Sequence, residues 1–430
     1  MSLIFYDDSP VFGGHEVMAL LGLEAVLAEW PGPVVFFTAA ANAKLCAELA
    51  ALAATHPQLR LETLDCHSSK LEALRNQLRP SRARRLAQRF EQLRPALVVA
   101  IQGNIEHSSL ALLAARRAAI PSTSYIPVPH SNAAMGARLG ALRDVFAKGL
   151  FHVPDSFITI SDEMARLLRL RGATAPIHIV YNGVDTARFQ PGETSAIAAR
   201  PGNAETDGTN GGGQDARATV ARASCPEPAF AAACRQLDLP SDKILLGVIG
   251  RIEFRQKQQH LLVQALATDP SLTAACHLVF AGDGPDRAAL RSLVGQHSIS
   301  ATFLPWCDPA PLYHALAALV IPSRYEGLPL VMLEALASGT AVLASDRDGM
   351  KDLLPAEWRF ESNNPTALAA TLVRFMQQGR PAPAPALVAR VRDSMSLEAF
   401  RRAFAATVLG LISRPGLQIS IPHQLHQSIP

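Results

Sequence analysis

The chain has 430 residues, a length that predicts two or three domains. Hydrophobic residues make up 49% of it and charged residues 18%, the balance of an α/β protein with large buried cores. The formal net charge of +3 is too small to indicate nucleic-acid binding, and no nucleic-acid recognition motif is visible, so we expect no nucleic-acid partner.

Cysteine usage and hydropathy bear on the compartment. None of the six cysteines forms a Cys-x-x-Cys pair, which favours free thiols in a reducing cytosol over zinc sites or disulfides. The opening residues "SLIFYDDSP" lack the pattern of a signal peptide, and no uncharged apolar run reaches the ~18 residues of a membrane span. We therefore expect a soluble, cytoplasmic protein, or one that is peripheral on the cytoplasmic face of a membrane.

The first half of the chain alternates short β-rich runs with longer helical patterns, such as residues 16–30 and 42–56. Strands separated by helices of this length predict a parallel sheet with right-handed crossovers. The expected strands are 3–6, 34–38, 59–64, 96–101, 123–128 and 156–161. We assign residues 1–185 to one such domain.

The composition changes at residues 190–229, where small and polar residues dominate and predict a flexible insert or linker. The alternation then restarts and predicts a second parallel-sheet domain over 230–395. Its expected strands are 243–250, 276–282, 301–305, 318–323 and 340–345. Residues 396–430 read as a terminal helix, which we expect to cross back to the first domain, followed by a tail.

Residues 323–339, "SRYEGLPLVMLEALASG", place two carboxylates in a mostly apolar run. Pro329 is tolerated only in the first helical turn, so Glu326 lies on a loop and Glu334 about one turn into a helix. The free N–H groups at a helix start bind phosphate, and flanking carboxylates accept hydrogen bonds from hydroxyls. This layout fits a nucleotide-sugar. The alternative is a capped core helix with two surface glutamates.

Residues 249–262, "IGRIEFRQKQQHLL", follow an expected strand and supply Arg251, Arg255 and Lys257 beside a glycine turn. Such cations could neutralise a leaving diphosphate. Alone, the run is more typical of a solvated helix face. Residues 280–294, "FAGDGPDRAALRSLV", form another strand, glycine loop and helix pattern.

Taken together, these segments resemble retaining glycosyltransferase family 4, whose members have the GT-B fold of two Rossmann-like domains closing over a nucleotide-sugar. The resemblance rests on the order of "GRIEFRQK", "AGDGPDR", "FLPW" and "PSRYEGLPLVMLEALASGTAVLAS", and extends to "IVYNGVDTARF" and "VFGGHEV". It covers most of the chain outside the insert and the tail.

The resemblance implies roles for the second half. Glu334 would hold the ribose hydroxyls and Glu326 the hydroxyls of the donor sugar, while Arg251 and Lys257 would neutralise the diphosphate. The interval between this arginine and lysine is one residue longer than is usual in the family, so Arg255 could replace Lys257. The backbone that would meet phosphate and sugar belongs to Gly327, Leu328, Pro329 and Leu330.

In the first half, the resemblance places Gly13 and Gly14 near the diphosphate, where glycines allow close backbone approach. His15 beside them has either a site role or only a surface role. His130 follows the fifth expected strand, where many family members have a histidine that contacts the donor sugar; the alternative is a structural histidine.

No nucleophile and base pair is evident. The resemblance implies retention through front-face attack assisted by the leaving phosphate oxygen, without a metal ion or other cofactor. The sequence "DRD" at 346–348 imitates a metal motif of another transferase fold, and we interpret it as a coincidence.

Residues 78–95 form a basic amphipathic pattern that favours either peripheral contact with an anionic membrane or an ordinary helix with a wet arginine face. The expected activity is transfer of a sugar to a glycan or lipid-linked acceptor. The alternatives are a nucleotide-sugar epimerase on the same fold and a non-catalytic sugar-nucleotide-binding subunit.

Overall fold

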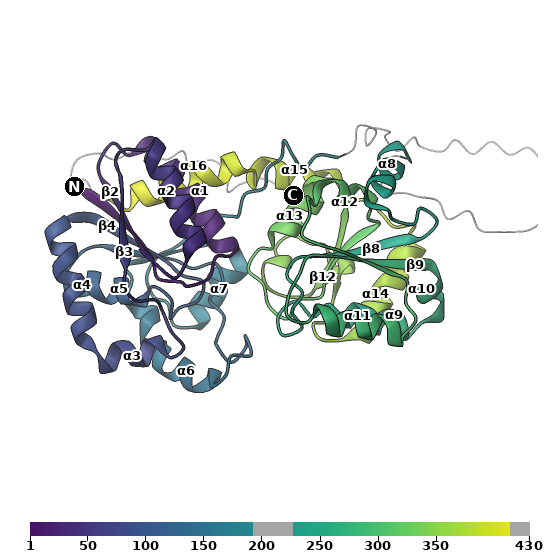
Figure 1. The fold of residues 1–430 in the computed structure, drawn as a ribbon, viewed down its shortest axis with the longest axis horizontal. Coiled ribbons are helices and arrows are strands. Elements are labelled where there is room, and N and C mark those ends of the chain that lie inside the picture. Colours follow the sequence, from purple (N-terminus) through teal and green to yellow (C-terminus); the bar gives the residue numbers. More distant parts are fainter. Residues whose placement is uncertain (192–226, 413–430) are drawn as a thin grey trace, which may run out of the picture.

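A computed structural model describes residues 1–191 and 227–412. It has two halves, each a parallel sheet flanked by helices, and they lie side by side (Figure 1). The predicted α/β architecture of two doubly wound sheets is therefore confirmed. The expected insert at 190–229 and the tail fall almost entirely outside the described residues.

The N-terminal half contains a seven-stranded parallel sheet in the order β3-β2-β1-β4-β5-β6-β7. The strands are β1 (Ser2–Asp7), β2 (Val34–Ala39), β3 (Leu59–Leu64), β4 (Pro95–Ile101), β5 (Ser122–Tyr125), β6 (Ser156–Thr159) and β7 (Ile177–Ile179). The helices are α1 (Gly14–Glu29), α2 (Ala43–Thr55), α3 (Glu72–Leu78), α4 (Pro80–Leu93), α5 (Ser109–Arg117), α6 (Gly140–Ala147), the 3-10 helix η1 (Lys148–His152) and α7 (Asp162–Leu170).

The burial of these strands explains why their apolar runs could be recognised in the sequence. Every residue of β1 and β2 is buried, because helices cover both faces of the sheet. Tyr6 of β1 stacks on Phe37 of β2 at 6.1 Å between ring centroids. The short edge strand β7 is only partly buried and was not predicted, because it lacks such an apolar run.

The C-terminal half contains a six-stranded parallel sheet in the order β10-β9-β8-β11-β12-β13. Its strands are β8 (Ile244–Ile249), β9 (Cys276–Ala281), β10 (Ala301–Leu304), β11 (Ala318–Ile321), β12 (Ala341–Ser345) and β13 (Arg359–Phe360). The helices of this half are α8 (Glu227–Leu237), α9 (His260–Ala267), α10 (Pro270–Ala275), α11 (Arg287–Gln296), α12 (Ala310–Ala315), α13 (Leu330–Ala337), η2 (Asp348–Met350), η3 (Ala356–Trp358), α14 (Pro365–Gln377) and α15 (Pro385–Ser394).

The last described helix, α16 (Leu397–Gly410), runs from the C-terminal half back along α1 of the N-terminal half (Figure 1). Its Phe404 is fully buried and packs edge-on against Tyr125 at 5.5 Å. Opposite Phe404 stands Gly22 of α1, where a β-carbon would approach the Phe404 ring to 2.5 Å. Helix α16 therefore ties the two halves together. Among the described helices, none has the length and apolar character needed to cross a bilayer.

Candidate active site

The loop that follows β11 leads to the start of α13 and carries the predicted acidic pair. Pro329 is the N-cap of α13, with an extended backbone (φ −62°, ψ 126°), and Leu330 is the first helical residue. Within the described residues, the N–H groups of Gly327, Leu328 and Leu330 donate to no other protein group. The helix therefore presents unused donors at its positive end, as an anion site requires.

Glu326 lies on this loop beside Lys257, which follows β8. The Nζ of Lys257 is 2.6 Å from Oε1 of Glu326. The Glu326 side chain is 8% exposed and that of Lys257 28%, so the pair is largely shielded from solvent. The structure thus brings these two predicted residues together, with the lysine satisfying a carboxylate that would be costly to bury alone.

Asp348 of η2 holds this loop in place, although the sequence indicated no role for it. Its Oδ2 accepts a hydrogen bond from the backbone N–H of Glu326 at 2.9 Å. Its Oδ1 lies 2.9 Å from Nε2 of His130, which comes from the N-terminal half. Asp348 is 6% exposed and has a φ of +56°, a left-handed conformation in which aspartate is enriched. One carboxylate therefore joins the histidine of one half to the glutamate loop of the other.

The same loop packs directly on the N-terminal half. A β-carbon at Gly327 would lie 2.7 Å from Cδ1 of Ile160 and 2.8 Å from the carbonyl oxygen of Pro127. The side-chain amide of Asn182 donates to the carbonyl of Leu328 at 2.8 Å. Only glycine permits this approach at position 327, so the residue serves the contact between the halves.

Glu334 lies one turn into α13 and is partly buried. Its Oε2 accepts a hydrogen bond from the hydroxyl of Tyr313 at 2.7 Å. Burial raises the pKa of Glu334 above its usual range, against the opposing effects of the Tyr313 hydrogen bond and the charge of Arg188. The carboxylate is thus held in one orientation at the side of the helix start.

The two arginines predicted near Lys257 are placed differently. Arg251 has a 60% exposed side chain whose Nε lies 3.7 Å from Oε2 of Glu253. No contact joins it to Lys257 or Glu326 within the described residues. Arg255 is exposed and lies near Tyr325 and beside Gly136 of the N-terminal half. In this state Lys257 alone of the three contacts the glutamate.

Gly13 is the N-cap of α1 and Gly14 its first residue, at the end of the loop that follows β1. The N–H of Gly13 donates to Oε2 of Glu16 at 2.7 Å, closing the first turn of the helix. A β-carbon at Gly14 would meet nothing within 4 Å. Gly14 therefore exposes backbone to open space at the carboxyl edge of the sheet, where ligands of open α/β sheets bind.

Three titratable side chains gather behind these glycines. Nε2 of His15 lies 2.9 Å from Oε1 of the fully buried Glu16, and Asp7 is close to both. Burial raises the pKa of Asp7 to about 7. Burial acts to lower the pKa of His15, but the hydrogen bond and the charge of Glu16 outweigh it and leave that pKa raised.

The ligand atoms of Asp7, His15 and Glu16 lie within 4.8 Å of one another, a spacing that a metal ion could bridge. However, Glu16 already caps α1 through one oxygen and meets His15 through the other. These contacts already give the cluster a structural role in the first turn of α1.

A cavity of about 740 Å³ lies between the halves, and both His130 and Asp348 line it. Basic and acidic side chains share its wall: Glu163, Arg166, Arg171, Asp346, Arg347, Lys351, Arg359 and Glu361. The paired side chains of His130 and Asp348 therefore lie between the glutamate loop and this polar cavity.

Two family models match the chain. The model described as Glycosyltransferase Family 4 matches residues 34–188, and the model described as Glycosyl transferases group 1 matches residues 243–378. Each match covers most of one sheet domain, and together they span well over half of the chain.

Curated relatives include a D-inositol 3-phosphate glycosyltransferase of Streptomyces griseus, 29% identical over 255 residues, 54% of this chain and 47% of that protein. The enzyme of the same name from Mycobacterium tuberculosis is 30% identical over 222 residues, 49% of this chain and 38% of that protein. The chain therefore spans about half or less of the length of these relatives.

Solved structures share the fold. Anabaena HepE in complex with UDP has a TM-score of 0.68 at 16% identity, with 95% of this chain and all of that chain covered. Sucrose-phosphate synthase from Thermosynechococcus elongatus has a TM-score of 0.66 at 19% identity, with 96% and 99% covered. The structures show the GT-B fold, and the two family models, which together span most of both sheet domains, show that the chain belongs to family 4 of the GT-B glycosyltransferases.

Proposed function

We propose that this protein transfers a sugar from a nucleotide-sugar donor to a glycan or lipid-linked acceptor, with retention of configuration and without a metal ion. The observation that carries the proposal is the start of α13. Unused N–H groups lie there between Glu326, paired with Lys257, and Glu334, paired with Tyr313. Anion donors flanked by hydroxyl acceptors are complementary to a diphosphate with a sugar at each end.

The comparisons support a nucleotide-sugar as the donor. Anabaena HepE, which shares the fold, was solved with UDP and with UDP-glucose. The curated relatives are named for an inositol phosphate, so a phosphorylated polyol is one acceptor to test on this chain.

Each residue has a distinct part in the proposed reaction. Glu326 accepts hydrogen bonds from hydroxyls of the transferred sugar, and Glu334 accepts them from the ribose. Lys257, with Arg251 or Arg255, compensates the charge that develops on the diphosphate as it leaves. His130, held by Asp348, faces the sugar from the N-terminal half. Gly13 and Gly14 let the backbone approach the phosphates, and the hydrogen-bond donor is the N–H of Gly14, because that of Gly13 is bonded to Glu16.

The reaction forms a bond from the acceptor oxygen to the anomeric carbon on the face from which the phosphate oxygen departs. The bond from the anomeric carbon to that phosphate oxygen breaks, and the proton of the acceptor hydroxyl passes to the departing oxygen. The protein contributes binding and charge stabilisation rather than a covalent intermediate.

The test is a panel of nucleotide-sugars screened by thermal shift, followed by donor hydrolysis and transfer assays with and without EDTA. Slow donor hydrolysis that Glu326→Ala abolishes supports the proposal. Conversion of the donor sugar to its epimer without an acceptor would indicate an epimerase. Donor binding with neither hydrolysis nor transfer would indicate a binding subunit, and loss of activity with EDTA would contradict metal independence.

The proposal includes a peripheral position on the cytoplasmic face of a membrane. The helix that would contact the membrane is α4. Phe90 and Ala87 of α4 are buried in the domain core, so they cannot insert into lipid. Binding would rest on the arginines of this helix and would weaken with salt. Co-sedimentation with anionic vesicles at low salt measures it, and absence of binding there would reject this part.

A further inference from the structure

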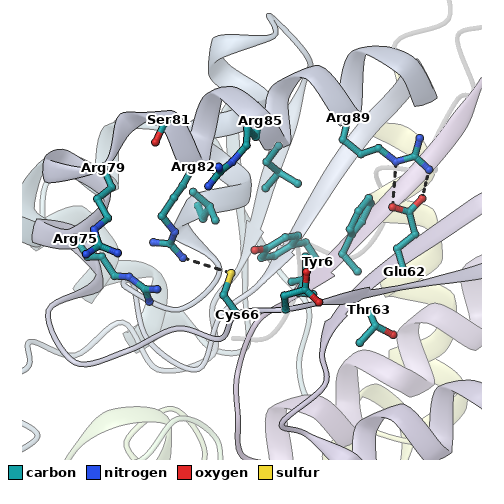
Figure 2. Close-up of a pocket in the computed structure, with 15 residues that line it drawn as sticks. Tyr6, Glu62, Thr63, Cys66, Arg75, Arg79, Ser81, Arg82, Arg85 and Arg89 are labelled. Atoms are coloured by element: carbon teal, nitrogen blue, oxygen red, sulfur yellow. Dashed lines mark hydrogen bonds and ion pairs between the residues drawn. The ribbon is translucent and has the colours of Figure 1, made fainter.

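A second cavity, of about 810 Å³, lies in the N-terminal half between α4 and the end of β3. Figure 2 shows arginine side chains from α3, α4 and the corner between these helices around it, with Tyr6 and Cys66 among the other lining residues. The arginines are Arg75, Arg79, Arg82, Arg85 and Arg89. Only two carboxylates, Glu62 and Asp65, line the same space, so the cavity is strongly positive.

Three of these guanidinium groups, those of Arg75, Arg82 and Arg89, are already paired with carboxylates. Arg89 forms two hydrogen bonds to the carboxylate of Glu62, one of them 3.1 Å long. Arg75 donates to Oε2 of Glu72 at 3.2 Å. Binding a ligand through Arg75 or Arg89 would weaken these ion pairs.

Arg82 is held rigidly at the wall of the cavity. Its side chain is 9% exposed, and its Nη1 donates to Oε1 of Glu72 at 2.5 Å and to Oδ1 of Asn76 at 2.8 Å. Its Nη2 meets only the sulfur of Cys66, at 3.7 Å, a weak acceptor. The second amino group of a fixed arginine is therefore available for a better acceptor.

The guanidinium groups of Arg79 and Arg85 have no hydrogen-bond or ion-pair partner within the described residues. Arg82 and Arg85, three residues apart, share the face of α4 that borders the cavity, and Arg79 lies at the corner directly before this helix. The hydroxyl of Tyr6 is also buried without a hydrogen-bond partner in the described part of the chain. The cavity thus has unused donors but only one unpaired carboxylate, that of the exposed Asp65.

Arginines in this number match phosphate, which accepts two parallel hydrogen bonds from each guanidinium. The cavity volume is typical of sites for whole small molecules and exceeds what one phosphate fills. The cavity also lies at the carboxyl end of β3 and beside β1, the sheet edge that carries Gly13 and Gly14. A molecule anchored here could extend along that edge toward the proposed donor.

We propose that this arginine pocket binds a phosphate monoester or diphosphate carried on the acceptor, either a free molecule or a lipid headgroup. The inference rests on the proposed transferase function, because it assigns the pocket to the acceptor. Arg79, Arg82 and Arg85 bind the phosphate, and the rest of the acceptor reaches the donor along the sheet edge.

The test uses Cys66, whose thiol lines the pocket, as a local reporter in the full-length protein. Alkylation by iodoacetamide is followed by mass spectrometry with inorganic pyrophosphate as the probe. We expect pyrophosphate to slow the alkylation of Cys66 and not that of Cys46, which lies outside the pocket in α2.

The test variant is Arg79→Gln/Arg85→Gln, which should raise the pyrophosphate concentration for half-protection by roughly tenfold or more, as expected when charge-assisted hydrogen bonds are removed. The matched control is Arg84→Gln/Arg117→Gln, with the same charge change at exposed residues outside the pocket. Equal half-protection in both double variants, or no protection of Cys66 in the natural sequence, would overturn the proposal.

The source of the phosphate is decided with vesicles containing phosphatidic acid. Protection of Cys66 by these vesicles but not by vesicles of phosphatidylcholine assigns a lipid headgroup, and protection by pyrophosphate alone assigns a free molecule. Donor hydrolysis separates this inference from the proposed function. If the natural protein hydrolyses no donor while Cys66 is protected, the transferase proposal fails and the anion site stands.

Discussion

Asp348 contacts both halves of the molecule through its two carboxylate oxygens. Oδ2 accepts a hydrogen bond from the N–H of Glu326, and Oδ1 meets the imidazole of His130, both at 2.9 Å. Its partners come from opposite halves of the molecule, and His130 is 218 positions away in the chain. Because the glutamate loop and the histidine share this one anchor, the geometry of the proposed sugar site depends on it.

Asp348→Asn should reduce donor hydrolysis and transfer by roughly ten- to a hundredfold, the range for weakening a charged hydrogen bond that positions a reacting group. Asparagine tolerates the left-handed backbone at this position, so the fold should persist. Steady-state kinetics with circular dichroism measures both effects. Asp346→Asn, at a half-exposed residue paired with Arg359, is the control, and equal activity of the two variants would refute the role of Asp348.

Glu326→Gln should reduce transfer by a hundredfold or more, on the order of the loss of a charge-stabilising group in a reacting site. The natural pair with Lys257 is largely buried, so the substitution also leaves the lysine without its partner. Single-turnover kinetics separates the chemical step from donor binding. Glu357→Gln, an exposed residue elsewhere in this half, should retain full activity; a comparable loss there would argue against a specific effect.

Donor affinity should depend on pH through Glu334. Burial raises the pKa of this carboxyl, so it takes up a proton at a higher pH than an ordinary glutamate. The ionised form is the better acceptor for ribose hydroxyls, and affinity should therefore fall as pH is lowered through the raised pKa. Calorimetric titration of the nucleotide across pH measures this. Glu334→Gln should bind roughly tenfold more weakly with this pH dependence removed, and an unchanged profile would exclude the contact.

The stability of the N-terminal half should depend on pH through the protonation of Asp7. Burial raises its folded-state pKa to about 7, whereas an unfolded aspartate titrates near ~3.9. The folded protein binds this proton more tightly, so the stabilisation is fully present below the unfolded pKa and is lost as pH rises through the folded one.

Asp7→Asn keeps an acceptor for the N–H of Ser9 and removes the charge. The melting temperature of this variant should exceed that of the natural protein above about pH 7 and match it below about pH 4. Thermal unfolding across pH measures the difference, with the exposed Asp242→Asn as control. If the variant were less stable at every pH, the charge of Asp7 would be compensated by its neighbours in the folded protein.

The packing of α16 on α1 can be measured with Phe404, which is fully buried against Gly22. Phe404→Ala should lower the free energy of unfolding by ~3–5 kcal/mol, the usual effect of emptying a core site of this size. Gly22→Ala should destabilise the natural protein, because the added carbon meets the ring, but should be tolerated beside Phe404→Ala. Denaturant unfolding of the four proteins gives the coupling, and additive effects would contradict the contact.

Much of the fold was predictable from local patterns. The runs at 34–38 and 96–101 are apolar on both faces and bounded by turns, so their strands could be located directly. Glycine, proline and the two glutamates in 323–339 likewise predicted a loop that enters a helix. The edge strands β7 and β13 were missed because they are short and only partly buried.

The sequence by itself determined the two alternating domains and the loop that carries Glu326 into α13, because these depend on short-range periodicity and on proline and glycine geometry. Only the tertiary structure decided that Asp348 meets His130 and that Lys257 rather than Arg251 meets Glu326. It also decided that arginines of α4 and of the corner before it line a cavity with Cys66. Such pairings depend on how distant elements dock against one another. Such docking produces no periodic pattern in the sequence. The residues that meet are brought together because other residues of their elements become buried.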